Sequence, residues 1–204
     1  SGLPRTPSNA SKAYVVSLCP NSARYSVEKI VDGMGNETEL TYDYLICNSN
    51  DNFYTCSGVV TYYNVEKKSV PMLALKEQKT YNVNGKPVVK RYNYKNALVH
   101  KKGHGFLGFE TITVKDYIDD RLVYKRLLEY NLETMGANCI PLLMSDKLIG
   151  GENQLIKDRY LEYEKYSCIK NEKVVVPLLV QDRETVYDVD RRGVIVKNIT
   201  KTNV

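Results

Sequence analysis

Two histidines four residues apart, His100 and His104, come nearest in this chain to a pattern that could bind a metal. On a helix, this spacing would place both imidazoles on one face, where they could share a zinc ion. The stretch His-Lys-Lys-Gly-His-Gly disfavours a helix because of its glycines, so the spacing loses that meaning. Zinc would need two further ligands, and no spacing nominates Cys139 or a carboxylate. We therefore predict no metal site and no cofactor.

The sequence gives equally little support for other groups of catalytic residues. Cys139 beside a histidine could act as a nucleophile, but no local motif marks it, and free cysteines usually pack as small apolar residues. The segment Gly-His-Gly-Phe-Leu-Gly lacks the Gly-Lys-Ser/Thr ending of a phosphate loop. Asp119–Asp120, Asp182 and Asp188–Asp190 lie at predicted turns or beside arginines, where Asp commonly bonds to local backbone. The sequence predicts that this is not an enzyme; catalysis by His104, Cys139 or paired carboxylates is the weakest of three hypotheses.

The amino-acid composition limits the classes of molecule that this chain is expected to bind. The 204 residues include 17 Tyr, 3 Phe and no Trp, and tyrosine suits half-buried strand faces. The formal net charge is +5, with 29 basic and 24 acidic residues interspersed along the chain. A basic stripe with exposed aromatics on a known module is missing, so we predict no nucleic-acid partner. No apolar run is long enough to cross a bilayer, so we predict no membrane insertion by this segment.

Five cysteines are scattered without a Cys-x-x-Cys motif: Cys19, Cys47, Cys56, Cys139 and Cys168. An odd number disfavours a complete disulfide framework. One bridge between Cys47 and Cys56 across a hairpin is compatible with the sequence, and so are buried free thiols.

Most of the chain has the period-two pattern of strands. Residues 1–12 predict an extended arm, and residues 13–204 predict one β-rich domain with a sub-boundary near 96–104. A hairpin is predicted with its turn at 32–36, where Gly33 and Gly35 can take positive φ. Asn84–Gly85 predicts a second hairpin, and Asp119–Asp120 a third turn. Pro177, within an apolar run, indicates a strand edge, a bulge or a break.

Two segments, 122–135 and 152–167, are compatible with either helix or strand, and we interpret both as strands. An Arg-x-x-x-Tyr pattern recurs in the C-terminal half, and in a strand residues four apart share one face. Each pair would then place a cation beside a phenol ring. The pairs are Arg126 and Tyr130, Arg159 and Tyr163, and Arg183 and Tyr187.

The histidine-containing stretch is better explained as backbone architecture. Gly103, Gly105 and Gly108 surround large apolar side chains, and glycines this dense indicate a bend or a β-bulge. Phe106 and Phe109 are predicted to be buried anchors where the chain bends, together with Leu107.

These residues resemble the middle region of the B component of bacterial insecticidal Tc toxins and related Rhs/YD-repeat proteins. The matching positions are Tyr92, Tyr94, Ala97, His100, Gly103, Gly105, Phe106, Leu107, Gly108, Phe109 and Asp116. His104 departs from the pattern, which more often has Arg there. Upstream, a stretch similar to a YD repeat contains Gly35, Asn36, Thr38, Tyr42 and Asp43. Together the two matches span residues of about 25 to 120.

The resemblance implies an all-β fold of consecutive antiparallel hairpins that form a curved, extended sheet. It implies a non-catalytic segment of a larger surface or toxin protein, whose β-shell encloses or presents a C-terminal polypeptide. The expected partner is the remainder of that polypeptide, with self-association through open sheet edges, and the expected location is extracellular or at a bacterial cell surface. The alternative is a β-sandwich that binds carbohydrate or protein through exposed tyrosines.

Overall fold

The computed structural model describes residues 15–18, 26–47, 52–57, 64–81, 86–103, 105–135, 138–168, 171–188 and 195–202. Within these ranges all regular structure is strand, so the all-β prediction is confirmed. The predicted arm at 1–12 lies outside the described residues. The strands are β1 (Val15–Leu18), β2 (Val27–Val31), β3 (Glu37–Leu45), β4 (Tyr54–Thr55), β5 (Val65–Lys67), β6 (Val70–Tyr81), β7 (Pro87–His100), β8 (Gly105–Ile118), β9 (Arg121–Met135), β10 (Asn138–Gly150), β11 (Leu155–Cys168), β12 (Asn171–Tyr187) and β13 (Ile195–Thr202).

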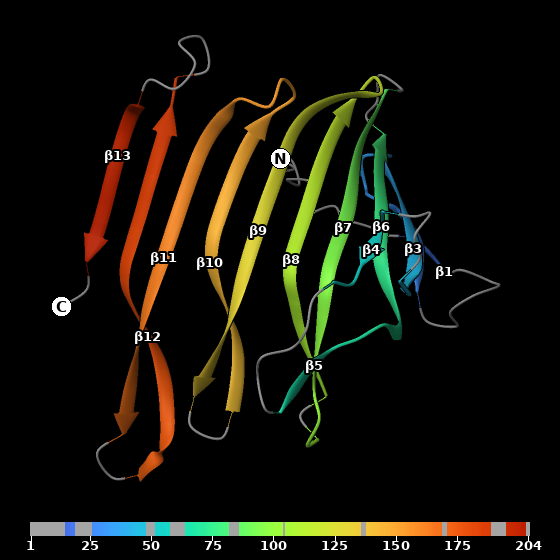
Figure 1. Cartoon of the computed structure of the whole chain (residues 1–204). Coiled ribbons are helices and arrows are strands. Elements are labelled where there is room, and N and C mark those ends of the chain that lie inside the picture. The colour runs from blue at the N-terminus through green and yellow to red at the C-terminus, as the bar shows by residue number, and fades with distance from the viewer. Residues whose placement is uncertain are drawn as a thin grey trace, which may run out of the picture.

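These strands form a single sheet in the described part of the chain (Figure 1). Its order is β1-β2-β3-β6-β7-β8-β9-β10-β11-β12-β13, each strand antiparallel to the next, with β4 and β5 added to β7. Because the described strands make one sheet, the two-sheet sandwich of the alternative hypothesis is wrong as an architecture. The segments with ambiguous patterns form β9 and β11, which confirms both as strands.

Local turn chemistry explains the hairpins. Asp119 and Asp120 have φ of 50° and 58°, and Ile118 pairs with Arg121, which is the geometry of a two-residue hairpin turn. In the β2–β3 turn, Gly35 takes φ of 81°, and the Asp32 carboxylate accepts hydrogen bonds from backbone N–H groups. Asn84–Gly85 lies outside the described residues, but the flanking β6 and β7 are paired antiparallel as predicted.

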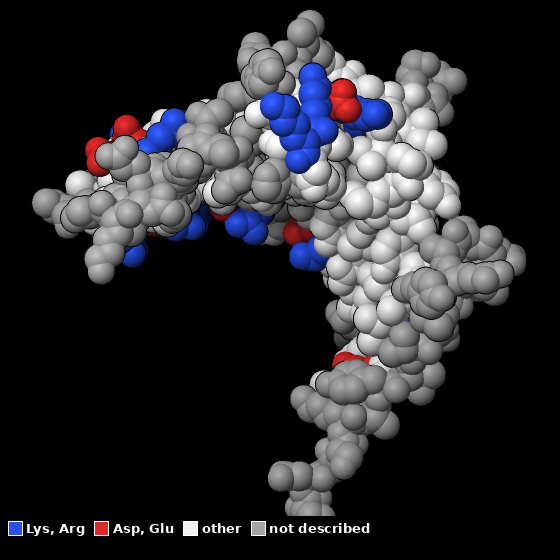
Figure 2. Space-filling view, turned by 90° about the horizontal axis from the view of Figure 1, so that it is seen from below, with Lys and Arg blue, Asp and Glu red and all other residues white. Residues whose placement is uncertain are grey.

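The sheet is not flat. Figure 2 shows two wings that meet at a bend around a hollow, and Figure 1 places the C-terminal strands in one wing and the N-terminal strands in the other. The pairing of β6 with β7 runs only from Tyr81 opposite Pro87 to Glu77 opposite Arg91. Beyond that point β7 pairs instead with β4 and β5. β4 and β5, which come from the segment between β3 and β6, therefore occupy the opening that the diverging strands create.

We call the described residues of this segment, 46–47, 52–57 and 64–69, the wedge. The main buried cluster lies where the wedge meets the sheet, and it consists of Leu45, Phe53, Tyr54 and Ala97. A second cluster contains Val65, Leu98 and Leu132. Many other large apolar side chains remain exposed, among them Tyr124, Tyr160, Tyr166, Val176 and Leu178. The protein thus concentrates its packing at the bend, while much of the sheet has two partly exposed faces.

Candidate functional site

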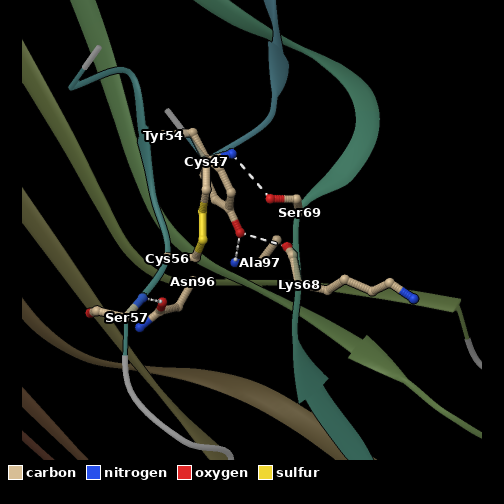
Figure 3. The surroundings of a disulfide bond; sticks show 8 residues. All are labelled: Cys47, Tyr54, Cys56, Ser57, Lys68, Ser69, Asn96 and Ala97. Carbon is tan, nitrogen blue, oxygen red and sulfur yellow. Dashed lines mark hydrogen bonds between the residues drawn. A yellow bond between two sulfur atoms is a disulfide. The ribbon is translucent and has the colours of Figure 1, made fainter. Parts of the chain in front are cut away.

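A disulfide links the start of the wedge, just after β3, to the residue that follows β4. Cys47, just after β3, is bonded to Cys56, just after β4, with a Cα–Cα distance of 5.9 Å (Figure 3). The backbone N–H of Cys47 donates to Ser69 Oγ at 3.0 Å, at the other end of the wedge. The sequence left this pair and buried free thiols both open; the structure contains the bridge, although it closes a loop instead of crossing a hairpin.

Tyr54 fastens the wedge to β7. Its side chain is 1% exposed, and its hydroxyl donates to the carbonyl of Lys68 at 2.6 Å (Figure 3). The same oxygen accepts a hydrogen bond from the N–H of Ala97 at 2.9 Å. Burial raises the pKa of the Tyr54 hydroxyl, against the lowering effect of the bond from Ala97. One protonated phenol therefore satisfies a backbone carbonyl of the wedge and a backbone N–H of β7.

Asn96 makes a second connection, from β7. It has φ of 53°, which asparagine tolerates better than most residues, and it is buried. Its Oδ1 accepts from the N–H of Ser57 at 2.8 Å, and its Nδ2 donates to the Glu110 carboxylate. Lys67 of the wedge also donates to Glu110, at 3.1 Å. Burial alone would raise the pKa of Glu110, but the bonds from Asn96 and Lys67 together lower it.

The two stretches that resemble the toxin family are linked through the wedge. Asp43 of the YD-like stretch accepts a hydrogen bond from Lys76 at 2.8 Å, and the Lys76 Nζ lies 5.5 Å from the Phe53 ring centroid. Phe53 contacts Tyr94 edge-on at 5.5 Å, and Tyr94 lies 4.5 Å from Phe109. Burial raises the pKa of Tyr94 to about 12. A continuous line of contacts thus joins the glycine-rich strand to the YD-like strand.

The other YD-like residues stabilise a turn and a strand pair. Asn36 Nδ2 donates to Asp32 at 2.8 Å, next to Gly35 in the β2–β3 turn. Thr38 lies opposite Thr80, with their hydroxyl oxygens 3.5 Å apart. Tyr42 lies on β3 opposite Leu75, beside a register shift. These contacts are local, so a family-specific role for the motif stays a prediction.

The glycine-rich strand contains the predicted bulge. Leu98 pairs with Gly108 and Val99 pairs with Phe106, which leaves Leu107 as the extra residue. Gly103, Gly105 and Gly108 have φ of 98°, 69° and 141°. At Gly108 an added Cβ would lie 3.4 Å from Pro141 Cγ, an ordinary contact, so glycine is favoured there by its φ and not by lack of space.

The burial predicted for this stretch is only partly correct. Leu107 packs against the second buried cluster, and Phe109 is partly buried against the first. Phe106 is 40% exposed, so the prediction that it is a buried anchor is wrong. The bulge turns Leu107 into the packed position instead, and Phe106 keeps only an edge contact with Phe109 at a centroid distance of 5.2 Å.

The residues first considered for chemistry do not assemble. His100 is buried, and its Nδ1 accepts a hydrogen bond from the Lys102 N–H at 3.2 Å, while His104 lies outside the described residues. Cys139 belongs to β10, but its side chain is not among those described. Among the described residues, no three His, Cys, Asp or Glu side chains are grouped to hold a metal ion. The same part of the chain has no helix of the length and apolarity that crossing a membrane requires.

A shallow groove lies beside the bend. It has a volume of about 330 Å³, and its lining includes Phe53, Lys76, Arg91, Lys115 and Tyr117. Two of its cations already bind carboxylates: Lys76 binds Asp43, and Arg91 binds Glu77 at 2.8 Å. The groove therefore resembles a solvated, charge-balanced surface more than a ligand site.

A row of charges crosses the C-terminal strands, and sequence reasoning missed it. Arg126 of β9 makes a two-point contact with Asp146 of β10, at 2.8 and 2.7 Å. Arg159 of β11 binds Asp182 of β12 in the same way, at 2.7 and 2.8 Å. The predicted partners were tyrosines four residues away. The main partner of both arginines is an aspartate instead, although Arg126 and Arg159 are also close enough to Tyr130 and Tyr163 to act against the rise that burial causes in the pKa of each hydroxyl.

Arg183 also differs from the prediction, since its guanidinium lies 6.0 Å from the ring of Tyr160 on β11 instead of over Tyr187. The signal that could have found the row is an aspartate 20 residues after Arg126 and 23 residues after Arg159. Such a spacing is what a hairpin produces. The bond from Arg159 lowers the pKa of Asp182 below its usual range.

Replacing Arg126 by glutamine should destabilise the protein by about 1.5–3 kcal/mol, the range for losing a charged partner of a buried group. The reason is that the Asp146 side chain is only 8% exposed and would lose a two-point contact. Chemical denaturation of the variant and the wild type measures the difference.

Lys86→Gln is the matched control. Lys86 binds Asp119 at 2.8 Å, but both side chains are well exposed, so the loss should stay below about 1 kcal/mol. Equal effects of the two substitutions would contradict the importance of the row.

The described residues thus form an open, curved, antiparallel sheet with a disulfide-bonded wedge at its bend. No protein-family model matches the chain, and no curated protein matches it. Solved structures do match. A chain in the crystal structure of TcdB2-TccC3-Cdc42 superposes with a TM-score of 0.52 at 11% identity, over 79% of this chain and 10% of that chain.

A chain in the crystal structure of TcdB2-TccC3-TEV gives a TM-score of 0.52 at 12% identity, over 86% of this chain and 12% of that chain. This protein therefore spans about a tenth of the length of the chains it resembles. At such identity the likeness concerns the fold alone, and the fold is similar to part of a Tc toxin complex.

Proposed function

We propose that this protein is a non-catalytic wall segment of a larger Rhs/YD-type toxin or surface protein. In that protein, its sheet would continue into further strands and form part of a shell that encloses or presents a C-terminal polypeptide. The observation that carries the proposal is the match of 79–86% of this chain to only 10–12% of the chains in TcdB2-TccC3 structures.

The architecture supports this proposal on physical grounds. The sheet described has two terminal strands, β1 and β13, each with a pairing partner on one side only. Unpaired edges of this kind promote association, and a closed wall removes them. Both faces are partly exposed, which suits a wall that meets solvent outside and a lumen inside. A wall also requires no catalytic group.

The disulfide supports a location outside the cytosol. Such bonds persist mainly in oxidising compartments, including secreted and cell-surface settings. The Cys47–Cys56 bridge holds the wedge at the bend, so it would protect the curvature of the wall after secretion. An extracellular or surface location, in a bacterium, is accordingly part of the proposal.

Cryo-electron microscopy of the full-length gene product tests the wall function. We expect both terminal edges, β1 and β13, to be hydrogen-bonded to further strands, and polypeptide density to lie inside the enclosed space. Edges that face solvent on a free-standing domain would overturn the proposal. Protease treatment before and after denaturation adds a second readout, since an enclosed polypeptide should be cleaved only after the shell opens.

The isolated chain should self-associate through its open edges. Light scattering at increasing protein concentration measures this, and the average mass should rise with concentration. A strictly monomeric profile at high concentration would count against unprotected edges.

A further inference from the structure

The charges on one face of the C-terminal strands alternate in sign across five strands. Asp146 of β10 lies directly opposite Arg159 of β11, and Asp182 of β12 lies directly opposite Lys201 of β13. Directly opposite residues share a face of the sheet. Arg126 on β9 and Arg159 on β11 join this row through their two-point contacts with Asp146 and Asp182. From β9 to β13, the charges of the row are therefore positive, negative, positive, negative and positive.

The last member of the row lies on the edge strand. β13 pairs with β12 on one side and is terminal among the described strands (Figure 1). On the face of the charged row it presents Lys197 and Lys201, both exposed, with Ile199 between them. The residues of β13, Ile195–Thr202, include no carboxylate.

Two carboxylates of β12, Asp182 and Glu184, are already engaged with β11. Arg159 binds Asp182 through both of its oxygens, and Lys157 binds Glu184 at 2.6 Å. Because each of these two carboxylates already has a cationic partner on β11, the two lysines of β13 leave the outer edge positive. The alternating row ends in two lysines on β13, whose outer edge is unpaired among the described strands. An acidic strand at that edge would be electrostatically complementary to these lysines.

A second copy of this chain can pair with this edge only through backbone hydrogen bonds, because its own described edge strands do not supply the acidic complement. A β13–β13 pair in any register would bring together two strands without carboxylates, and several registers would place lysine against lysine. The other terminal strand, β1, has the sequence Val-Val-Ser-Leu, which also contains no acidic residue. The occupant must therefore bring its own acidic side chains.

We infer that the outer edge of β13 is the docking edge for an antiparallel β-strand with carboxylates opposite Lys197 and Lys201. The inference rests on the proposed wall function, since the remainder of the larger polypeptide supplies this strand. The acidic side chains extend the alternating row by one strand. They also select the register, because a slip by one residue moves the carboxylates to the opposite face of the sheet.

Two labelled synthetic peptides test this edge by fluorescence anisotropy. Both have an alternating Thr-Val background; one carries two glutamates four residues apart, and the other carries lysines at the same positions. Lys197 and Lys201 have the same spacing. On the wild-type chain, the glutamate peptide should bind about tenfold or more tightly than the lysine peptide, since cross-strand attraction replaces repulsion at two positions. Added salt should reduce the difference.

The double variant Lys197→Glu/Lys201→Glu should reverse the preference. The control, Lys101→Glu/Lys102→Glu, makes the same change in net charge in the exposed β7–β8 turn and should leave the preference unchanged. Equal binding of the two peptides, no binding of the glutamate peptide, or an unchanged preference in the edge variant would overturn the inference.

Failure of the inference and failure of the wall function are distinguishable. A full-length structure in which β13 pairs with a strand lacking carboxylates opposite Lys197 and Lys201 refutes only the inference. A full-length structure in which the β13 edge faces solvent refutes the wall, whatever the peptides show.

Discussion

Replacing Leu45 by alanine should lower the free energy of unfolding by about 2–5 kcal/mol, the range for emptying a buried leucine site. Leu45 is 0% exposed and belongs to the cluster with Phe53, Tyr54 and Ala97. This cluster joins the end of β3, the wedge and β7, which are elements on different sides of the bend. The cavity would therefore form where three separate segments meet, and little nearby backbone could collapse to fill it. Urea denaturation measures the change.

Leu178→Ala provides the control for this substitution. Leu178 lies on β12 and is 50% exposed, so the same change of side chain should cost less than about 1 kcal/mol. If Leu45→Ala were no more damaging than Leu178→Ala, the wedge would not be the packing centre of the protein.

Removing the disulfide should produce the second large effect. Cys47 and Cys56 are separated by 9 residues in sequence, and closing a loop of that size typically contributes about 2–4 kcal/mol by limiting the unfolded chain. The double variant Cys47→Ala/Cys56→Ala should therefore have a lower thermal midpoint. The wedge should loosen first, because the bridge joins Cys56, just after β4, to Cys47 at the end of β3.

A reducing agent separates this effect from a packing defect. Reductant should lower the thermal midpoint of the wild type toward that of the double variant and should leave the double variant unchanged. Hydrogen exchange gives a local readout, since the amide of Ala97, bonded to Tyr54, should exchange faster once the bridge is lost. Equal midpoints for oxidised wild type and double variant would mean that the bridge does not stabilise the bend.

Much of the local structure could be predicted from residue patterns. Asp119–Asp120 and Asp32 with Gly35 form turns because their side chains and φ preferences act within a few residues. Pro177 lies in a part of β12 that pairs with β11 but not with β13, whose pairing begins at Gln181. A missing N–H costs little where one side of a strand has no partner.

The glycine-rich strand marks the limit of such reasoning. Dense glycines predicted the bulge, and the register between β7 and β8 contains it. The sequence alone could not predict which side chain is buried, because that depends on which residue the bulge turns toward the sheet. Leu107 takes the packed position that Phe106 was expected to fill, and Phe106 remains 40% exposed.

By itself, the sequence determined the strand class, the turns, the bulge and the absence of a recognisable catalytic motif, since these depend on neighbours within a few residues. Only the tertiary structure decided that β4 and β5 would lie beside β7 where β6 diverges from it, and that alternating charges would align from Arg126 to Lys201. Both features depend on register between strands whose paired residues are more than ten residues apart in sequence. Register is set by the packing of whole strands, so it cannot be predicted from any single stretch of residues.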